Sequence, residues 1–176
     1  MNLTDYKLKP FISAEKIAQR VEQIGQEINK DFEGEEVTAV FLLNGAMFFG
    51  IDLIRHISLP VIVDTLSVSS YEGMSSSGVI KINSDLKSNL KDKNILLIED
   101  IIDTGQTLES ILKFVSQKKP KKIVTACLLN KPSRRLCDVE VEYIGFEIED
   151  KFVVGYGLDY EHYFRNLKEI KIYEPQ

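Results

Sequence analysis

The sequence is poor in cysteine, since Cys127 and Cys137 are its only thiols. Two cysteines cannot form a disulfide framework, and His56 and His162 do not cluster with them as zinc ligands would. Cys127 lies inside an apolar run, where a free thiol packs as a small core residue. This cysteine content fits the reducing cytosol, and we therefore expect a cytoplasmic protein.

Long apolar runs and an excess of positive charge are also missing. No run reaches the roughly 18 apolar residues of a membrane span, and the first eleven residues lack the apolar segment of a signal peptide. The net charge of -5 gives no general attraction for nucleic acid or for an anionic membrane. We expect neither nucleic acid nor a membrane among the partners.

The 176 residues have an ordinary globular composition, with 44% hydrophobic and 28% charged residues, and are enough for one domain with a real core. Apolar runs of strand length alternate with segments of helical periodicity. We expect strands at 37–43, 60–68, 79–82, 94–99, 121–129 and 141–148, and helices at 13–31, 46–57 and 106–116. Ser13 is the expected N-cap of the first helix.

Runs that are apolar on both faces and alternate with helices predict an α/β fold, with a mostly parallel twisted sheet flanked by helices. Ligands of such sheets bind beyond the carboxyl ends of the strands. Four segments should converge at that edge. They are Asn44-Gly45, Glu99 to Thr107, Lys131 and a segment near 150–160.

The stretch "ILLIEDIIDTGQTLESI", residues 95–111, contains a candidate phosphate site. Gly105 allows close approach of the backbone, and the segment from Thr104 to Thr107 should open the following helix. Free N–H groups and the helix dipole make such an end an anion site, to which the two threonine hydroxyls add donors. The spacing of a Walker A loop is absent.

Three acids precede this loop: Glu99, Asp100 and Asp103. A carboxylate only accepts hydrogen bonds, so Glu99 and Asp100 could hold a vicinal diol. A phosphate site beside a diol acceptor describes a cradle for ribose 5-phosphate. The alternative is a set of acids placed near a helix N-terminus by the dipole alone, and the number of acids favours the site.

The segment "LLIEDIIDTGQTL" resembles the phosphoribosyl diphosphate motif of the type I phosphoribosyltransferases. Further segments resemble, in order, the family's pyrophosphate loop, mobile loop, base-recognition lysine and closing signature. They are "FLLNGAMFF", "SSYEGMSSSGVIKI", "LLNKP" and "DKFVVGYGLDYEHYFRNL". The mobile loop and the closing signature are specific to the branch that acts on 6-oxopurines, the hypoxanthine-guanine phosphoribosyltransferases.

The resemblance implies an enzyme of purine salvage that is a single domain over 1–176. Its core would span about 35–145, and a small hood would come from about 1–12 and 146–176. It would transfer the phosphoribosyl group of phosphoribosyl diphosphate to N9 of hypoxanthine or guanine, giving IMP or GMP and pyrophosphate. Mg²⁺ would be the cofactor, and a homodimer or homotetramer is expected.

The resemblance also implies a role for each residue near the ribose and the base. Asp103 would transfer a proton near N7, while Glu99 and Asp100 would hold the ribose hydroxyls and, with Asp159, the metal. The base would meet Lys131 at O6, the ring of Phe152, the backbone of Val153, and the carbonyl of Asp159 at the guanine amine. The 5-phosphate would lie against Asp103, Thr104, Gly105, Gln106 and Thr107.

The resemblance implies that the remaining matched residues contact the pyrophosphate. These residues are Leu43, Asn44, Gly45, Ser70, Tyr71 and Arg165. At residues 43–45 the contact would come from backbone N–H groups, with a cis peptide bond before residue 44. Ser70 and Tyr71 lie on a Ser/Gly-rich loop that could close as a lid and that we expect to be disordered without ligand. The family resemblance places Asn44 and Gln106 where many relatives carry lysine, so the side-chain charge is missing at both places. Backbone contacts remain at Asn44, and the Gln106 side-chain amide can still donate.

Two other functions stay open at this point. The phosphoribosyltransferase fold also serves nucleotide-sensing regulators that bind nucleic acid, but the broad basic face of such a protein is absent at a net charge of -5. An enzyme that prefers xanthine would share O6 and therefore Lys131. Discrimination among hypoxanthine, guanine and xanthine depends on groups near C2 that the sequence does not identify.

Overall fold

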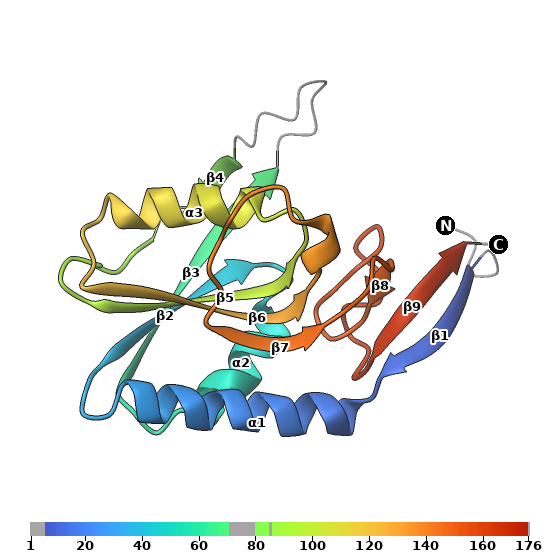
Figure 1. Ribbon diagram of the computed structural model, residues 1–176, viewed down its shortest axis with the longest axis horizontal. Coiled ribbons are helices and arrows are strands. Elements are labelled where there is room, and N and C mark those ends of the chain that lie inside the picture. Colours follow the sequence, from blue (N-terminus) through green and yellow to red (C-terminus); the bar gives the residue numbers. More distant parts are fainter. Residues whose placement is uncertain (1–5, 71–79, 85, 176) are drawn as a thin grey trace.

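The computed structural model describes residues 6–70, 80–84 and 86–175 and shows a six-stranded sheet with helices on both faces (Figure 1). The strands lie in the order β4-β3-β2-β5-β6-β7, all parallel to their neighbours except the antiparallel β4. Their bounds are β2 Val37–Leu43, β3 Val61–Ser70, β4 Ile80–Ser84, β5 Asn94–Ile102, β6 Lys122–Asn130 and β7 Tyr143–Glu147. The predicted α/β fold with a mostly parallel sheet is confirmed.

Three helices cover this sheet, with α1 and α2 on one face and α3 on the other (Figure 1). Their bounds are α1 Ala14–Asp31, α2 Met47–Arg55 and α3 Gln106–Ser116. The helix predicted at 106–116 is matched to the residue. Ser13 caps α1 as predicted, because its side chain accepts a hydrogen bond from the Lys16 N–H at 3.4 Å.

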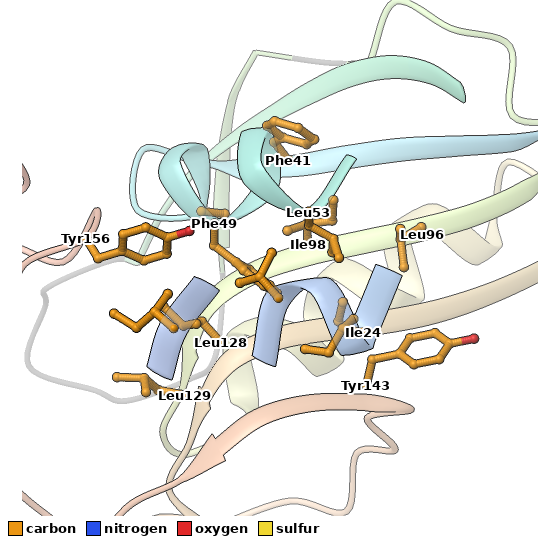
Figure 2. Close-up of a cluster of buried hydrophobic side chains, with 14 of the residues drawn as sticks. Ile24, Phe41, Phe49, Leu53, Leu96, Ile98, Leu128, Leu129, Tyr143 and Tyr156 are labelled. Atoms are coloured by element: carbon orange, nitrogen blue, oxygen red, sulfur yellow. The ribbon is translucent and has the colours of Figure 1, made fainter. Parts of the chain in front are cut away.

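Strand β5 is buried on both faces, which explains its unbroken apolar sequence. Leu96 and Ile98 point to the core beneath α1 and α2, where Figure 2 shows them with Ile24, Phe49 and Leu53. Ile95 and Leu97 belong to the second core, under α3. Each such side chain stabilises the fold by about 1.5–3 kcal/mol through its burial.

The structure corrects the end of this strand. The apolar pattern predicted a strand over 94–99 with Asp103 at the following turn, whereas β5 continues to Ile102. Asp100 is therefore also a strand residue, since pairing with β6 persists as far as Ile102. The helix begins at Gln106, as predicted, with Gly105 as its N-cap.

A second sheet has three strands in the order β1-β9-β8, and the sequence patterns did not identify them as strands. They are β1 Tyr6–Ile12, β8 Val153–Val154 and β9 Ile170–Pro175. β1 and β9 pair antiparallel, and β1 is half-exposed and contains Pro10, features that weaken an apolar strand signal. The division into a core and a hood stays a prediction, although this sheet joins segments from both ends of the chain.

Asp64 on β3 holds residues 87–88, in the segment that leads into β5, by hydrogen bonds. It is buried at 6% exposure and accepts hydrogen bonds from the N–H groups of Thr65, Lys87 and Ser88, at 2.7–2.9 Å. Burial alone would raise the pKa of this carboxyl, but the N–H donors outweigh it and hold the pKa below its ordinary value.

We predict that Asp64→Asn lowers the free energy of unfolding at neutral pH by about 2–3 kcal/mol, because the amide accepts fewer of these hydrogen bonds. The pKa of Asp64 is lower in the folded than in the unfolded protein, so its stabilisation is present above the unfolded pKa and is lost as the pH falls through the folded value. Denaturant titrations at several pH values should show the difference shrinking in acid. The exposed Asp138→Asn is the control, and a difference that stayed constant with pH would contradict the assignment.

Candidate active site

A cavity of about 260 Å³ lies at the carboxyl ends of β2, β3 and β5, where they meet the start of α3. The fold places it at the edge that parallel sheets use for ligands. It is lined by Leu42, Leu43, Gly45, Val68, Glu99, Asp100, Ile101, Ile102, Asp103, Thr104, Gly105, Thr107 and Leu108. The three acids and the predicted phosphate loop therefore share one cavity.

The loop before α3 has the geometry of an anion site. Gly105 has a φ of +84°, and a Cβ there would lie 3.0 Å from side-chain atoms of Arg135 and Cys137. Only glycine adopts this conformation without strain, so it lets the chain turn sharply into the helix. The Thr104 hydroxyl accepts from the Gln106 N–H at 3.4 Å, and the first turn of α3 faces the cavity with its dipole.

The two acids at the end of β5 differ in burial. Glu99 is 9% exposed, and burial first and the neighbouring charge of Asp100 second raise the pKa of Glu99 well above its ordinary value. Asp100 is more open, and its carboxylate accepts from the Ile101 N–H at 2.9 Å. The pair offers carboxyl oxygens of unequal exposure to whatever enters the cavity.

The loop after β2 lies directly against Asp100. The peptide bond from Leu43 to Asn44 is cis. A Cβ on Gly45 would lie 1.7 Å from the Asp100 carboxylate, and one on Gly157 would lie 2.2 Å from the Gly45 carbonyl oxygen. The loop at Gly45, strand β5 at Asp100 and the segment at Gly157 are distant in sequence. They thus approach one another so closely that a side chain on either glycine would not fit.

A second cavity of about 250 Å³ adjoins the first and is lined by Asp100, Ile101, Asp103, Lys131, Phe152, Val153, Leu158 and Asp159. It contains all four residues predicted to bind a base and shares three residues with the first cavity. Lys131 is buried at 7% exposure, while Phe152 is 51% exposed. A planar ring could therefore stack on Phe152 while Lys131 reaches its edge.

Asp159 and Arg165 form an ion pair, with Nη2 at 2.6 Å from Oδ1. The other Asp159 oxygen accepts from the His162 N–H at 2.8 Å, and Arg165 also donates to the Gly157 carbonyl at 2.5 Å. The arginine thereby ties together two parts of the closing segment, Gly157 and Asp159. Asp159 would have to exchange these partners to hold a metal ion.

Some predicted residues lie apart from both cavities. Among the described residues, Asn44, Gln106 and Arg165 line neither one. Ser70 is the last residue of β3, and Tyr71 lies outside the described residues, as does most of its loop. The sequence reasoning also missed Arg134 and Asp150, which form ion pairs with Asp103 and Lys131. The available signals were the closeness of Arg134 to Lys131 in sequence and the position of Asp150 as the first residue of the closing signature.

Comparison with known proteins agrees with this geometry. The model of the phosphoribosyl transferase domain family matches residues 12–161. A hypoxanthine-guanine phosphoribosyltransferase of Aquifex aeolicus is 44% identical over 170 residues, or 96% of each chain, and one of Staphylococcus aureus is 39% identical over 171 residues with the same coverage.

A solved structure extends the similarity to the fold. The crystal structure of a Bacillus anthracis hypoxanthine-guanine phosphoribosyltransferase superposes with a TM-score of 0.92 at 39% identity, and the match covers 97% of this chain and 99% of that one. The similarity therefore spans the complete sheet as well as the loops that form the two cavities. The chain belongs to the phosphoribosyltransferase family and, within it, to the hypoxanthine-guanine phosphoribosyltransferases.

Proposed function

We propose that this enzyme transfers the 5-phosphoribosyl group of phosphoribosyl diphosphate to N9 of hypoxanthine or guanine, giving IMP or GMP and pyrophosphate. The observation that carries the proposal is the pair of adjoining cavities that share Asp100, Ile101 and Asp103. One cavity offers a phosphate loop and diol acceptors, and the other offers an exposed ring and a buried lysine. The shared wall is where a sugar and a base would be joined.

In the first cavity, the loop from Thr104 to Thr107 would hold the 5-phosphate through N–H and hydroxyl donors. Glu99 and Asp100 would accept hydrogen bonds from the ribose hydroxyls. Leu43, Asn44 and Gly45 would offer backbone N–H groups to the pyrophosphate. Ser70, Tyr71 and Arg165 would contact the pyrophosphate as well. These donors would stabilise the charge that grows on the leaving group as N9 attacks.

In the second cavity, Phe152 would stack on the purine, and the backbones of Val153 and Asp159 would meet its far edge. Lys131 would donate to O6. An adenine has a donor at that place, so the lysine would repel it. Asp103 would hold or move the proton at N7, and acid–base groups in such roles contribute about 10²–10⁴-fold.

The acids present also fit a magnesium ion that arrives with the substrate. Nowhere in the described part of the chain do three His, Cys, Asp or Glu side chains come together as a metal cage. Mg²⁺ usually binds through one or two carboxylates and substrate phosphates, and Glu99, Asp100 and Asp159 offer such carboxylates. When bound, Mg²⁺ would neutralise negative charge on the pyrophosphate oxygens.

The cellular location, the oligomeric state and the macromolecular partners of the enzyme rest on the sequence. In the described residues, every helix is too short or too polar to cross a lipid bilayer. A cytoplasmic location, a homodimer or homotetramer, and the absence of nucleic acid among the partners stay predictions from the sequence.

The first test is a pyrophosphate-release assay with Mg²⁺ and phosphoribosyl diphosphate, in which hypoxanthine, guanine, xanthine and adenine are offered separately. We predict turnover with hypoxanthine and guanine, and a loss of about 10²-fold or more in kcat for Asp103→Asn, because an amide cannot take up the N7 proton. Binding of ligand with no turnover for any base would overturn the enzyme assignment. Faster turnover of xanthine would keep the chemistry and change the preferred base.

A second prediction concerns the contact between Gly45 and Asp100. Gly45→Ala should lower kcat/KM for phosphoribosyl diphosphate by about 100-fold, because the added Cβ must displace the Asp100 carboxylate. Gly34→Ala is the control: no atom lies within 4 Å of its Cβ position, and its φ of +77° makes the variant less stable without touching the site. Wild-type kinetics for Gly45→Ala would show that Asp100 does not need its observed position.

A further inference from the structure

Arg134 is an inner member of a row of four side chains with alternating charges, beside the second cavity. Its Nε is 3.1 Å from Oδ1 of Asp103, and its Nη1 is 3.4 Å from Oδ2 of Asp150. The other oxygen of Asp150 lies 3.4 Å from Nζ of Lys131. The row therefore runs Lys131, Asp150, Arg134, Asp103. At its two ends stand the residues assigned to O6 and N7 of the purine.

The backbone fixes where this arginine sits relative to Asp103. The Lys131 N–H donates to the Ile102 carbonyl at 3.0 Å, and the Leu136 N–H donates to the Thr104 carbonyl at 2.9 Å. These two hydrogen bonds flank Asp103 on both sides along the chain. Between them the 3₁₀ turn η1 Pro132–Arg134 folds back, with the Arg134 N–H donating to the Lys131 carbonyl at 3.1 Å.

Arg134 itself does not line either cavity among the described residues, so it would not touch the sugar or the base. It engages Oδ1 of Asp103, and within the described residues no hydrogen bond reaches Oδ2, so this oxygen can face a ligand. A planar guanidinium can bind two carboxylates in fixed directions, which a lysine ammonium does not do. The arginine is therefore suited to orient Asp103 and not to bind substrate.

We propose that Arg134 is a positioning residue that orients the Asp103 carboxylate toward N7. Through Asp150, Arg134 also sets the distance between Asp103 and Lys131. This inference rests on the proposed function. The ion pairs are exposed, with side-chain exposures of 49% for Arg134 and 41% for Asp103, and such pairs contribute little to folding. The substitution should thus affect the reaction without unfolding the protein.

The test uses steady-state kinetics of the full chain with hypoxanthine, phosphoribosyl diphosphate and Mg²⁺. Arg134→Gln should lower kcat by about 10-fold and leave KM for phosphoribosyl diphosphate unchanged, because a misdirected carboxylate transfers a proton less efficiently. Arg134→Lys should recover only part of the loss, since the ammonium keeps the positive charge but lacks the rigid planar geometry that directs the two carboxylates. Arg55→Gln is the matched control, an exposed arginine paired with Asp52 at 3.9 Å on α2.

A double-mutant cycle separates positioning from other effects. If Arg134 acts through Asp103, then Arg134→Gln should cost less than about 2-fold in kcat once Asp103→Asn is present. The same 10-fold loss in both backgrounds, or a wild-type kcat for Arg134→Gln alone, would overturn the inference. Absence of turnover in the wild-type protein would instead overturn the proposed function, so the two failures are distinguishable.

Discussion

The parallel pairing of β5 with β2 on one side and β6 on the other is the constraint on which the site depends. In the β5–β6 register, Ile102 lies opposite Asn130, so Asp103 and Lys131 leave the sheet as neighbours. A slip of one residue would turn every side chain of β5 to the opposite face and bury charge in the core. The apolar residues Ile95 to Ile98, packed on both faces, make such a slip costly and thereby fix the geometry of the acids that follow.

Close backbone approach is the second requirement. At Gly45 the loop after β2 touches the Asp100 carboxylate, and at Gly157 the closing segment touches the loop in turn. Each contact depends on the absence of a side chain, so three loops can surround one small volume. The ion pair between Arg165 and Asp159 and the hydrogen bond from the Tyr156 hydroxyl to Asp52 at 2.7 Å hold the closing segment in this position.

Three cations near the site are engaged with acids in the described structure, while Arg135 beside Gly105 donates to the Asn130 side chain instead. Lys131 faces Asp150, Arg134 faces Asp103 and Asp150, and Arg165 faces Asp159. Asp103 and Lys131 line the second cavity, so the ion pairs of Arg134 and Lys131 lie at its wall. Asn44 and Gln106 are uncharged and add no cation to the site.

The sequence by itself determined the helices and strands of the main sheet, because periodicity and apolar runs are local properties that the fold preserved in α3 and β2. It also predicted the tight loop at Gly105 that opens α3, since the glycine and its threonines lie within a few residues of one another. Only the tertiary structure decided that β5 extends past Glu99 to Ile102, because pairing with β6 continues as far as Asn130. It alone joined Arg134 to Asp103 and Asp150, since ion pairs between residues up to 31 positions apart depend on sheet register and leave no periodic signal.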